Sequence, residues 1–342
     1  VDAARAMLAI TDDDEVLGRL ELELRGRTRE EPRNVELLRK LLALAELKRD
    51  RDLAFLTLSV LDAIDQLASG EETARFKELL SSARHTSISR EATLSEGELR
   101  ALLAPSGDGR QQQLVRSVFG AATELEQLEP ARFGVGRAQR VNARDPHALR
   151  EDVRALATPL GLTIGDVYVG GNEGNAIVAL PRDNELGFLL GGDIESPLAG
   201  AARQRAAMQL AGVSLQTLPL VTRGAEGGAK LLAAAILSEN LPLAPGAPRD
   251  NELTRQVAKL LPRKVKRALA DLLRALPDKG ADLVGPCRHA LARTRRLALL
   301  LSGELSAALR EVGQDPEAQL DLLRTWLGVP MSTSRRKLGL TQ

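Results

Sequence analysis

The sequence predicts an α+β protein that is mostly helical, with helical hairpins followed by a helical domain that contains a small three-stranded sheet. Aromatic residues make up only 2% of the 342 residues. Leu and Ala must therefore fill the core, which suits helices packed on helices. The hydrophobic period changes from helical to strand-like only in the middle of the chain, in short runs rich in Val, Ile and Leu at 162–169, 176–180 and 186–190.

The composition is that of an ordinary globular chain, with 44% hydrophobic and 27% charged residues. A net charge of +1 provides no overall attraction to nucleic acid or anionic membranes. The single cysteine, Cys287, excludes an internal disulfide and fits a reducing, cytoplasmic location. We expect no membrane span, because no run of about 18 apolar residues occurs. The helical sequence directly after Val1 suggests a piece of a longer protein.

Residues 1–83 read as consecutive helices. The stretch 34–48 carries one apolar stripe, formed by Leu37, Leu38, Leu41, Leu42 and Leu44. After the short polar turn 49–51 we expect Asp52 to cap a second helix, with an inward face of Ala54, Leu58, Leu61 and Ile64. Such a short turn predicts a helical hairpin, and 71–83 would begin the next one.

Local signals place further helices. Ser95 and Glu98 have capping-box spacing, and Asp145 followed by Pro146 is a typical helix start. After the strands we expect Ser196 to cap a buried helix over 197–211 that lies against the strands 162–169 and 186–190. The later helices are expected near 226–238, 250–261, 263–275, 280–302, 303–312 and 316–327. We expect domains at 1–85 (hairpins), 86–145 (a helical connector) and 146–342 (an α+β domain with C-terminal helices).

Two resemblances extend this interpretation. The hairpin around Ala54 resembles a tetratricopeptide (TPR) repeat. The region from Pro105 to Leu340 resembles the C-terminal region of large TPR proteins of myxobacteria and their relatives. The residues that carry this likeness are Leu160–Val169, Gly191–Ile194, Thr294, Leu299–Leu309, Asp321–Trp326 and Arg336–Leu340. This resemblance implies a bacterial protein that binds other proteins within a larger assembly.

The middle of the chain also resembles a zinc metallopeptidase of the gluzincin, CaaX-processing and heat-shock type, in which a strand with Asn-Ala (here Asn175-Ala176) precedes the metal helix. The family's His-Glu-x-x-His positions hold Arg203, Gln204 and Ala207, and the later acid is replaced by Arg293–Arg296. The resemblance therefore implies a metallopeptidase-like fold without a metal, a cofactor or a catalytic residue. We expect Arg203 to lie near Arg293–Leu301, with Glu304 or Asp193 as an acidic neighbour.

Other candidate motifs have simpler interpretations. The glycines at 134–136 and 170–174 lack the flanking residues of a phosphate-binding loop and predict turns. Ser302 before Gly303 has no histidine placed to activate it. Cys287 and His289 are two residues apart on a helix and would face different ways, which predicts a buried structural cysteine.

Basic clusters leave a second class of function open. Those with a possible partner-binding role are Arg263, Lys264, Lys266, Arg267, Arg293, Arg295 and Arg296, and a third cluster is Arg335–Lys337. They could be solvated helix faces or could bind an acidic partner, and the missing aromatic residues argue against nucleic acid. We therefore interpret the chain as a non-catalytic scaffold protein that binds other proteins. The alternatives are an enzyme with a site assembled by the fold, near Asp193 and Glu195, and a basic surface that docks nucleic acid. The oligomeric state is not indicated.

Overall fold

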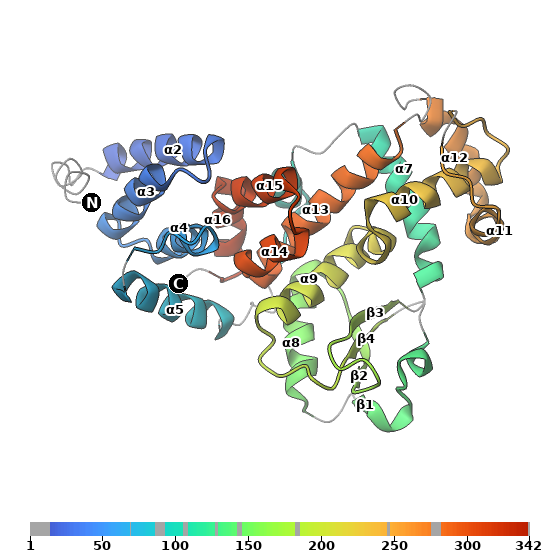
Figure 1. Ribbon diagram of the computed structural model, residues 1–342, viewed down its shortest axis with the longest axis horizontal. Coiled ribbons are helices and arrows are strands. Elements are labelled where there is room, and N and C mark those ends of the chain that lie inside the picture. Colours follow the sequence, from blue (N-terminus) through green and yellow to red (C-terminus); the bar gives the residue numbers. More distant parts are fainter. Residues whose placement is uncertain are drawn as a thin grey trace. The chain divides into compact units, whose positions relative to one another are not determined.

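The computed structural model describes residues 14–68, 70–85, 93–104, 109–126, 129–141, 146–181, 185–244, 247–274 and 282–340. These residues form fifteen α-helices and one four-stranded mixed sheet (Figure 1), which confirms the predicted α+β, mostly helical class. Two compact units divide the chain. Unit 1 comprises 1–102, 196–204 and 299–342, and unit 2 comprises 103–195 and 205–298. The boundaries of these two units therefore differ from those of the expected domains 1–85, 86–145 and 146–342.

Unit 1 begins with a stack of antiparallel helices. Each helix of the stack contacts the next one along the chain. The stack consists of α2 (Asp14–Glu30), α3 (Val35–Leu47), α4 (Arg51–Ala63) and α5 (Gly70–His85). The side chain of Asn34 caps α3 by accepting from the N–H groups of Glu36 and Leu37. The predicted hairpin is therefore present as α3 and α4.

The cap of α4 lies two residues before the predicted one. Asp50 caps the helix by accepting from the N–H of Leu53, whereas Asp52 lies inside α4 and is buried. Sequence alone cannot separate two aspartates this close together at a helix start, because either could serve as the cap. Ile64, expected on the inward face, is instead the half-buried residue at the end of α4.

C-terminal helices complete the core of the stack. In unit 1, α14 (Leu305–Val312) contacts α4, and α15 (Pro316–Trp326) contacts α2 (Figure 1). The last helix, α16 (Val329–Lys337), was not expected from the sequence, because its residues are mostly polar. Residues 305–337 thus provide the apolar partner surface that an isolated pair of hairpins needs.

We expect that Ala54→Leu lowers the free energy of unfolding by about 1–3 kcal/mol, because extra methyl groups would overpack the hairpin. Ala54 is fully buried, together with the predicted inward residues Leu38, Leu41, Leu58 and Leu61. Urea titration of the variant and the wild type gives the difference. Lys40→Leu, on the outer surface of α3, is the control and should change little. An unchanged stability for Ala54→Leu would mean that the site has space that the fold does not show.

The basic cluster Arg335–Lys337 is not one solvated face. Arg336 and Lys337 are exposed, but the Arg335 side chain is only 1% exposed. Its Nε donates to Asp52 Oδ1 over 2.9 Å, and its guanidinium lies over the rings of Phe55 and Trp326, at 4.9 and 5.5 Å from their centroids. Arg335 is thus a core residue of unit 1.

The predicted capping box lies at the start of α6 (Glu96–Leu103). The N–H and hydroxyl of Ser95 donate to Glu98 Oε2, and the N–H of Glu98 donates to Ser95 Oγ. Hydrogen bonds from Lys337 and then from Ser95 hold the pKa of Glu98 at about 2. Glu98 therefore stays ionised near neutral pH and keeps the box closed.

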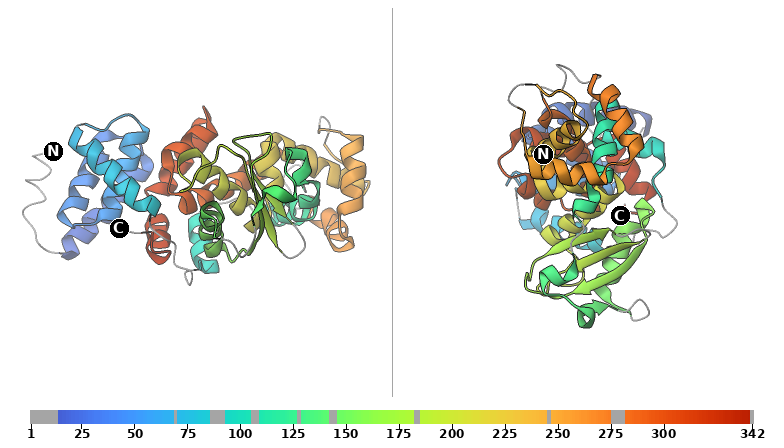
Figure 2. Two further views of the ribbon diagram at one scale, coloured as in Figure 1. Left: turned by 90° about the horizontal axis from the view of Figure 1, so that it is seen from below. Right: turned by 90° about the vertical axis from the view of Figure 1, so that its right-hand side faces the viewer.

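Unit 2 is built around the sheet (Figure 2). The strand order in the sheet is β1-β2-β4-β3. β2 and β4 are parallel, and β4 and β3 are antiparallel. The strands are β1 (Arg140–Val141), β2 (Ile164–Val169), β3 (Ile177–Pro181) and β4 (Leu186–Leu190). The three predicted strands are confirmed. β1 was missed, since two residues are too few for any alternation to be recognised.

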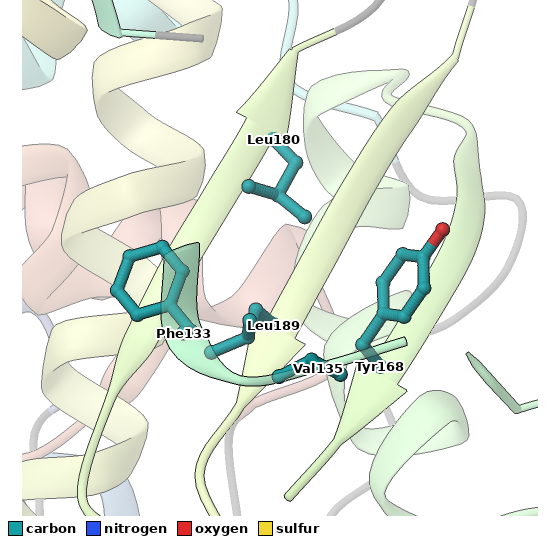
Figure 3. Packing of buried hydrophobic residues seen from close by; sticks show 5 residues of the cluster. All are labelled: Phe133, Val135, Tyr168, Leu180 and Leu189. Carbon is teal, nitrogen blue, oxygen red and sulfur yellow. The ribbon is translucent and has the colours of Figure 1, made fainter. Parts of the chain in front are cut away.

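One hydrophobic cluster packs Phe133 and Val135 onto the sheet residues Tyr168, Leu180 and Leu189 (Figure 3). Phe133 ends the short 3-10 helix Pro130–Phe133, and Gly134 follows it in the left-handed conformation, with φ of 69°. The glycines around Val135 therefore shape a turn that carries a core residue. This agrees with the turn interpretation of the sequence.

The helices of unit 2 follow the sequence signals with shifted ends. α8 (Ala148–Ala157) contacts β2 and begins after His147, so Pro146 is not its first residue as expected; Asp145 lies outside the described residues. α10 (Leu218–Ser238) is interrupted at Gly224, so the expected segment near 226–238 is its second part. The remaining helices are α7 (Gly109–Ala122), α9 (Gly200–Ser214), α11 (Asn251–Leu260), α12 (Arg263–Arg274) and α13 (Val284–Ser302), of which α9 and α13 have residues in both units. Among the described residues, none of the helices is both long and apolar enough to cross a membrane.

Candidate functional site

The helix that was expected to hold the metal ligands, α9, begins at Gly200 and not at Pro197. Ser196 and Pro197 precede it in irregular backbone, so Ser196 is not its cap. The N–H of Gly200 instead donates to Glu304 Oε1 over 2.9 Å. A carboxylate at this end is favoured by the helix dipole. The cap thus comes from a residue 104 positions further along the chain, which no local pattern could indicate.

The first turn of α9 is connected to the end of α13 by a chain of hydrogen bonds. Arg203 Nε donates to the carbonyl oxygen of Ser302 over 2.8 Å, and Ser302 Oγ lies 2.7 Å from Gln204 Oε1. Gln204 Nε2 donates in turn to Glu311 Oε2 over 3.2 Å. We call the set Arg203, Gln204, Ser302, Glu304 and Glu311 the α9 latch. All of its residues belong to unit 1.

Glu304 is the latch carboxylate that pairs with an arginine. Arg84 donates two hydrogen bonds to the carboxylate of Glu304, from Nε to Oε1 over 2.7 Å and from Nη2 to Oε2 over 3.0 Å. These hydrogen bonds raise the pKa of Arg84 above its ordinary value. A cavity with room for about one water molecule adjoins the latch, lined in part by Arg84, Arg203 and Glu304. The predicted acidic neighbour Glu304 therefore lies beside Arg203.

Asp193, the other candidate neighbour, belongs to unit 2 and is exposed. Its carboxylate lies against Gly174, and its N–H donates to the carbonyl of Gly174. Glu195, with which it was paired as a possible catalytic site, is exposed as well. An open depression nearby is lined by 173–178 and Arg205, but it does not include either acid. The two carboxylates are thus not brought together in a pocket.

The α9 latch can hold a helix but is poorly suited to catalysis. The Ser302 hydroxyl donates to an amide oxygen, which cannot take its proton, so the serine is not activated as a nucleophile. Gln204 has both side-chain atoms in hydrogen bonds, and Ala207 is fully buried in α9. Within the described residues, no cluster of His, Cys, Asp and Glu could hold a metal ion. The arrangement fixes the start of α9 to the end of α13 and to the residues that follow it.

Further along α9, two side chains cover the free edge of the sheet. Arg205 Nη1 donates to the carbonyl of Asn175 over 2.9 Å, and Gln209 Oε1 accepts from the N–H of Ala179 over 3.1 Å. Arg205 and Gln209 are four residues apart on α9, and Asn175 and Ala179 are four residues apart on β3 and the segment just before it, so one face of α9 follows this edge. An uncovered edge would be a template for pairing with another chain. α9 therefore lies beside β3, the edge strand of the sheet, and these two hydrogen bonds do not test the expected contact with the strands 162–169 and 186–190.

The glycine-rich turn at 170–174 is a place of close backbone packing. A side chain on Gly171 would meet the carbonyl of Phe133 at 2.4 Å, and one on Gly191 would meet the carbonyl of Gly174 at 2.1 Å. Gly171 also has a φ of 105°, a conformation that favours glycine. These glycines are therefore required by the packing of the turn, as the turn interpretation predicted.

The predicted basic residues have different environments. Arg263, Lys264 and Arg267 are exposed on α12. Lys266 donates to the carbonyl of Ala258 and pairs with Glu239. On α13, Arg295 is half-buried, Arg293 donates to Gln112 on α7, and the buried Arg296 donates to the carbonyls of Leu103 and Ala104. Nothing in the sequence distinguishes these residues, but among them only Arg263, Lys264 and Arg267 are exposed.

We expect the thiol of Cys287 to resist alkylation by iodoacetamide at pH 8 in the folded protein and to react fully in urea. Cys287 is buried whereas His289 is exposed, as the helical spacing predicted. Burial first, and then the charges of Asp282 and Glu226, raise the pKa of the thiol to about 12, so hardly any thiolate is present. Mass spectrometry of the alkylated protein measures the reaction. Rapid labelling without denaturant would contradict the buried position.

Comparison with protein-family models, curated proteins and solved structures finds no match to this chain. The fold and the site define a mostly helical α+β protein in which polar side chains hold the start of helix α9. The resemblances to TPR proteins and to metallopeptidases stay predictions.

Proposed function

We propose that the chain is a non-catalytic scaffold protein, with a TPR-like arm and a metallopeptidase-like domain that does not bind metal, and that it binds other proteins within a larger assembly in the cytoplasm. One observation carries the proposal. In unit 1 the helices α14 and α15 contact α4 and α2, while α3 and α5 are joined to each other by ion pairs. The stack therefore uses one side for its own core and presents the other as a polar surface.

This polar surface, the α3/α5 face, consists of Glu36, Arg39, Lys40 and Glu46 on α3 and of Glu72, Arg75 and Glu78 on α5. Arg39 pairs with Glu72, and Arg75 Nη1 lies 2.6 Å from Glu46 Oε1. These pairs fix the spacing of the two helices. Glu36 and Glu78 are exposed, so the face carries charges of both signs at fixed positions. Rigid helices with such a pattern suit the recognition of a partner helix or peptide.

The α9 latch supports the non-catalytic part of the proposal. Arg203 donates a hydrogen bond to Ser302, and Gln204 donates one to Glu311. Glu304 pairs with Arg84 and also caps α9. Buried polar groups that satisfy one another stabilise a single arrangement of helices and leave little capacity for a substrate. The buried thiol of Cys287 supports a reducing location, because it has no disulfide partner.

Photocrosslinking from two matched positions tests the proposal. A benzoylphenylalanine replaces Glu78 on the α3/α5 face or Glu317 on α15, both of which are exposed glutamates of unit 1. In extract of the source cells, position 78 should give a discrete crosslinked protein, and position 317 should not. Excess wild-type protein should compete, and the charge-reversed variant Lys40→Glu should compete less. Equal products from both positions, or none from position 78, would contradict the proposed face.

A further inference from the structure

Two arginines of unit 2 meet above one face of α7. Gln112 and Arg116 are four residues apart on α7 and so lie one turn apart on the same face. Arg293 of α13 reaches this face, because its Nη1 donates to Gln112 Oε1. Arg116 is exposed, and Arg293 is half-buried. The two guanidinium groups therefore stand on neighbouring positions of one surface.

One hydrogen-bond donor of Arg293 has no acceptor among the described residues. Its Nε is buried and has no acceptor within the described part of the chain. The groups that act on its charge are also cationic: the pKa of Arg293 is lowered by burial first, and then by repulsion from Arg116 and Arg296. Arg296 is already committed to the carbonyls of Leu103 and Ala104. An anion between Arg116 and Arg293 would satisfy the free donor and relieve the repulsion.

We propose that Arg116 and Arg293 form a binding site for a dianionic phosphate monoester, which the Nε of Arg293 and the guanidinium of Arg116 grip from two sides. A phosphate dianion carries two negative charges and enough acceptor oxygens for two guanidinium groups. A carboxylate or a sulfate ester carries one negative charge and balances only one of the two guanidinium charges. Gln112 holds the Arg293 side chain in place, so part of the ordering cost is already met in the free protein.

A nucleic-acid ligand fits this surface less well. The aromatic side chains of unit 2 that the structure describes are Phe119, Phe133, Tyr168 and Phe188, and all of them are buried. Bases would therefore find no ring to stack on. The site belongs to unit 2, so the inference does not depend on the α3/α5 face of unit 1.

Calorimetric titration with phenyl phosphate at constant ionic strength tests the site, with phenyl sulfate as the monoanionic comparison. Wild-type protein should bind phenyl phosphate and bind phenyl sulfate at least about tenfold more weakly. Arg116→Gln, at an exposed position, should weaken phosphate binding by about tenfold or more, and Arg293→Met should do the same. Arg267→Gln on α12 removes the same charge from another exposed helix and should change binding by less than about twofold.

Two further probes separate the sources of the phosphate. A phosphoserine peptide that binds much tighter than phenyl phosphate would indicate a phosphorylated polypeptide, and equal affinities would indicate a small ester; both results support the site. Three results would overturn it: no binding of phenyl phosphate by the wild type, an equal loss in Arg267→Gln, or binding of duplex DNA that Arg116→Gln leaves unchanged while phenyl phosphate fails to compete.

Discussion

Replacing Arg335 with Met lowers the free energy of unfolding by about 3–5 kcal/mol, because it leaves the carboxylate of Asp52 buried without its partner. The Arg335 and Asp52 side chains are only 1% and 7% exposed. Arg335 also donates through Nη2 to the carbonyl of Leu340 and lies over the rings of Phe55 and Trp326. Burial already raises the pKa of Asp52, and the charge of Arg335 acts against this rise. The variant should therefore take up a proton at Asp52 as well as losing stability.

Urea unfolding of three further variants checks this expectation. Arg336→Met removes an exposed neighbouring charge and should change the stability by less than about 0.5 kcal/mol. The double variant Arg335→Met with Asp52→Leu removes the whole ion pair and should recover most of the loss, whereas Asp52→Leu alone leaves Arg335 unpaired and should be costly. If Arg335→Met and Arg336→Met behave alike, the pair does not contribute to the core of unit 1.

Gly191→Ala should destabilise unit 2 by about 3 kcal/mol or more, at the upper end of the range for overpacking. A Cβ at this position would lie 2.1 Å from the carbonyl oxygen of Gly174 and 2.4 Å from that of Glu173. Both contacts are with backbone, so the turn after β2 would have to move. The hydrogen bond from the N–H of Gly191 to the carbonyl of Ala176, which follows that turn, would be strained as a result.

Gly192→Ala provides the matched control. Its Cβ would lie 3.8 Å from the nearest heavy atom, the Cα of Gly170, which is an ordinary contact. We expect a change of less than about 0.5 kcal/mol for this neighbour. Circular dichroism during urea unfolding measures both variants. A similar small effect at both positions would show that the backbone of the turn is not closely packed against Gly191.

Periodic and local features could be predicted from the sequence. The Leu stripe of α3, the capping box at Ser95 and the three runs that became β2, β3 and β4 all depend on residues near one another in the chain. Such patterns define an element without knowledge of its neighbours. The mostly helical α+β class followed from them. Helix ends were less accurate, as Asp50 in place of Asp52 and His147 in place of Pro146 show.

Long-range partnerships could not be predicted. Glu304 caps α9 from 104 residues away, and Arg335 pairs with Asp52 across 283 residues. Nothing in the local sequence distinguishes Arg335 from the exposed Arg336, or the buried Arg296 from the exposed Arg263. Charged side chains are usually exposed, so a buried one is recognised only when its partner is known. In the sequence, Gln204 was considered as part of a degenerate metal site and Ser302 as a nucleophile. Their structural role in the latch became visible only in the fold.

Zinc content is the most direct measurement of whether α9 carries a latch in place of a metal site. Elemental analysis of gently purified protein should find far less than one zinc per chain, because Arg203, Gln204 and Ala207 offer no ligand set and the first two are held by Ser302 and Glu311. Treatment with a chelator should leave the melting temperature unchanged. One zinc per chain, removed by the chelator with a fall in melting temperature, would contradict the latch.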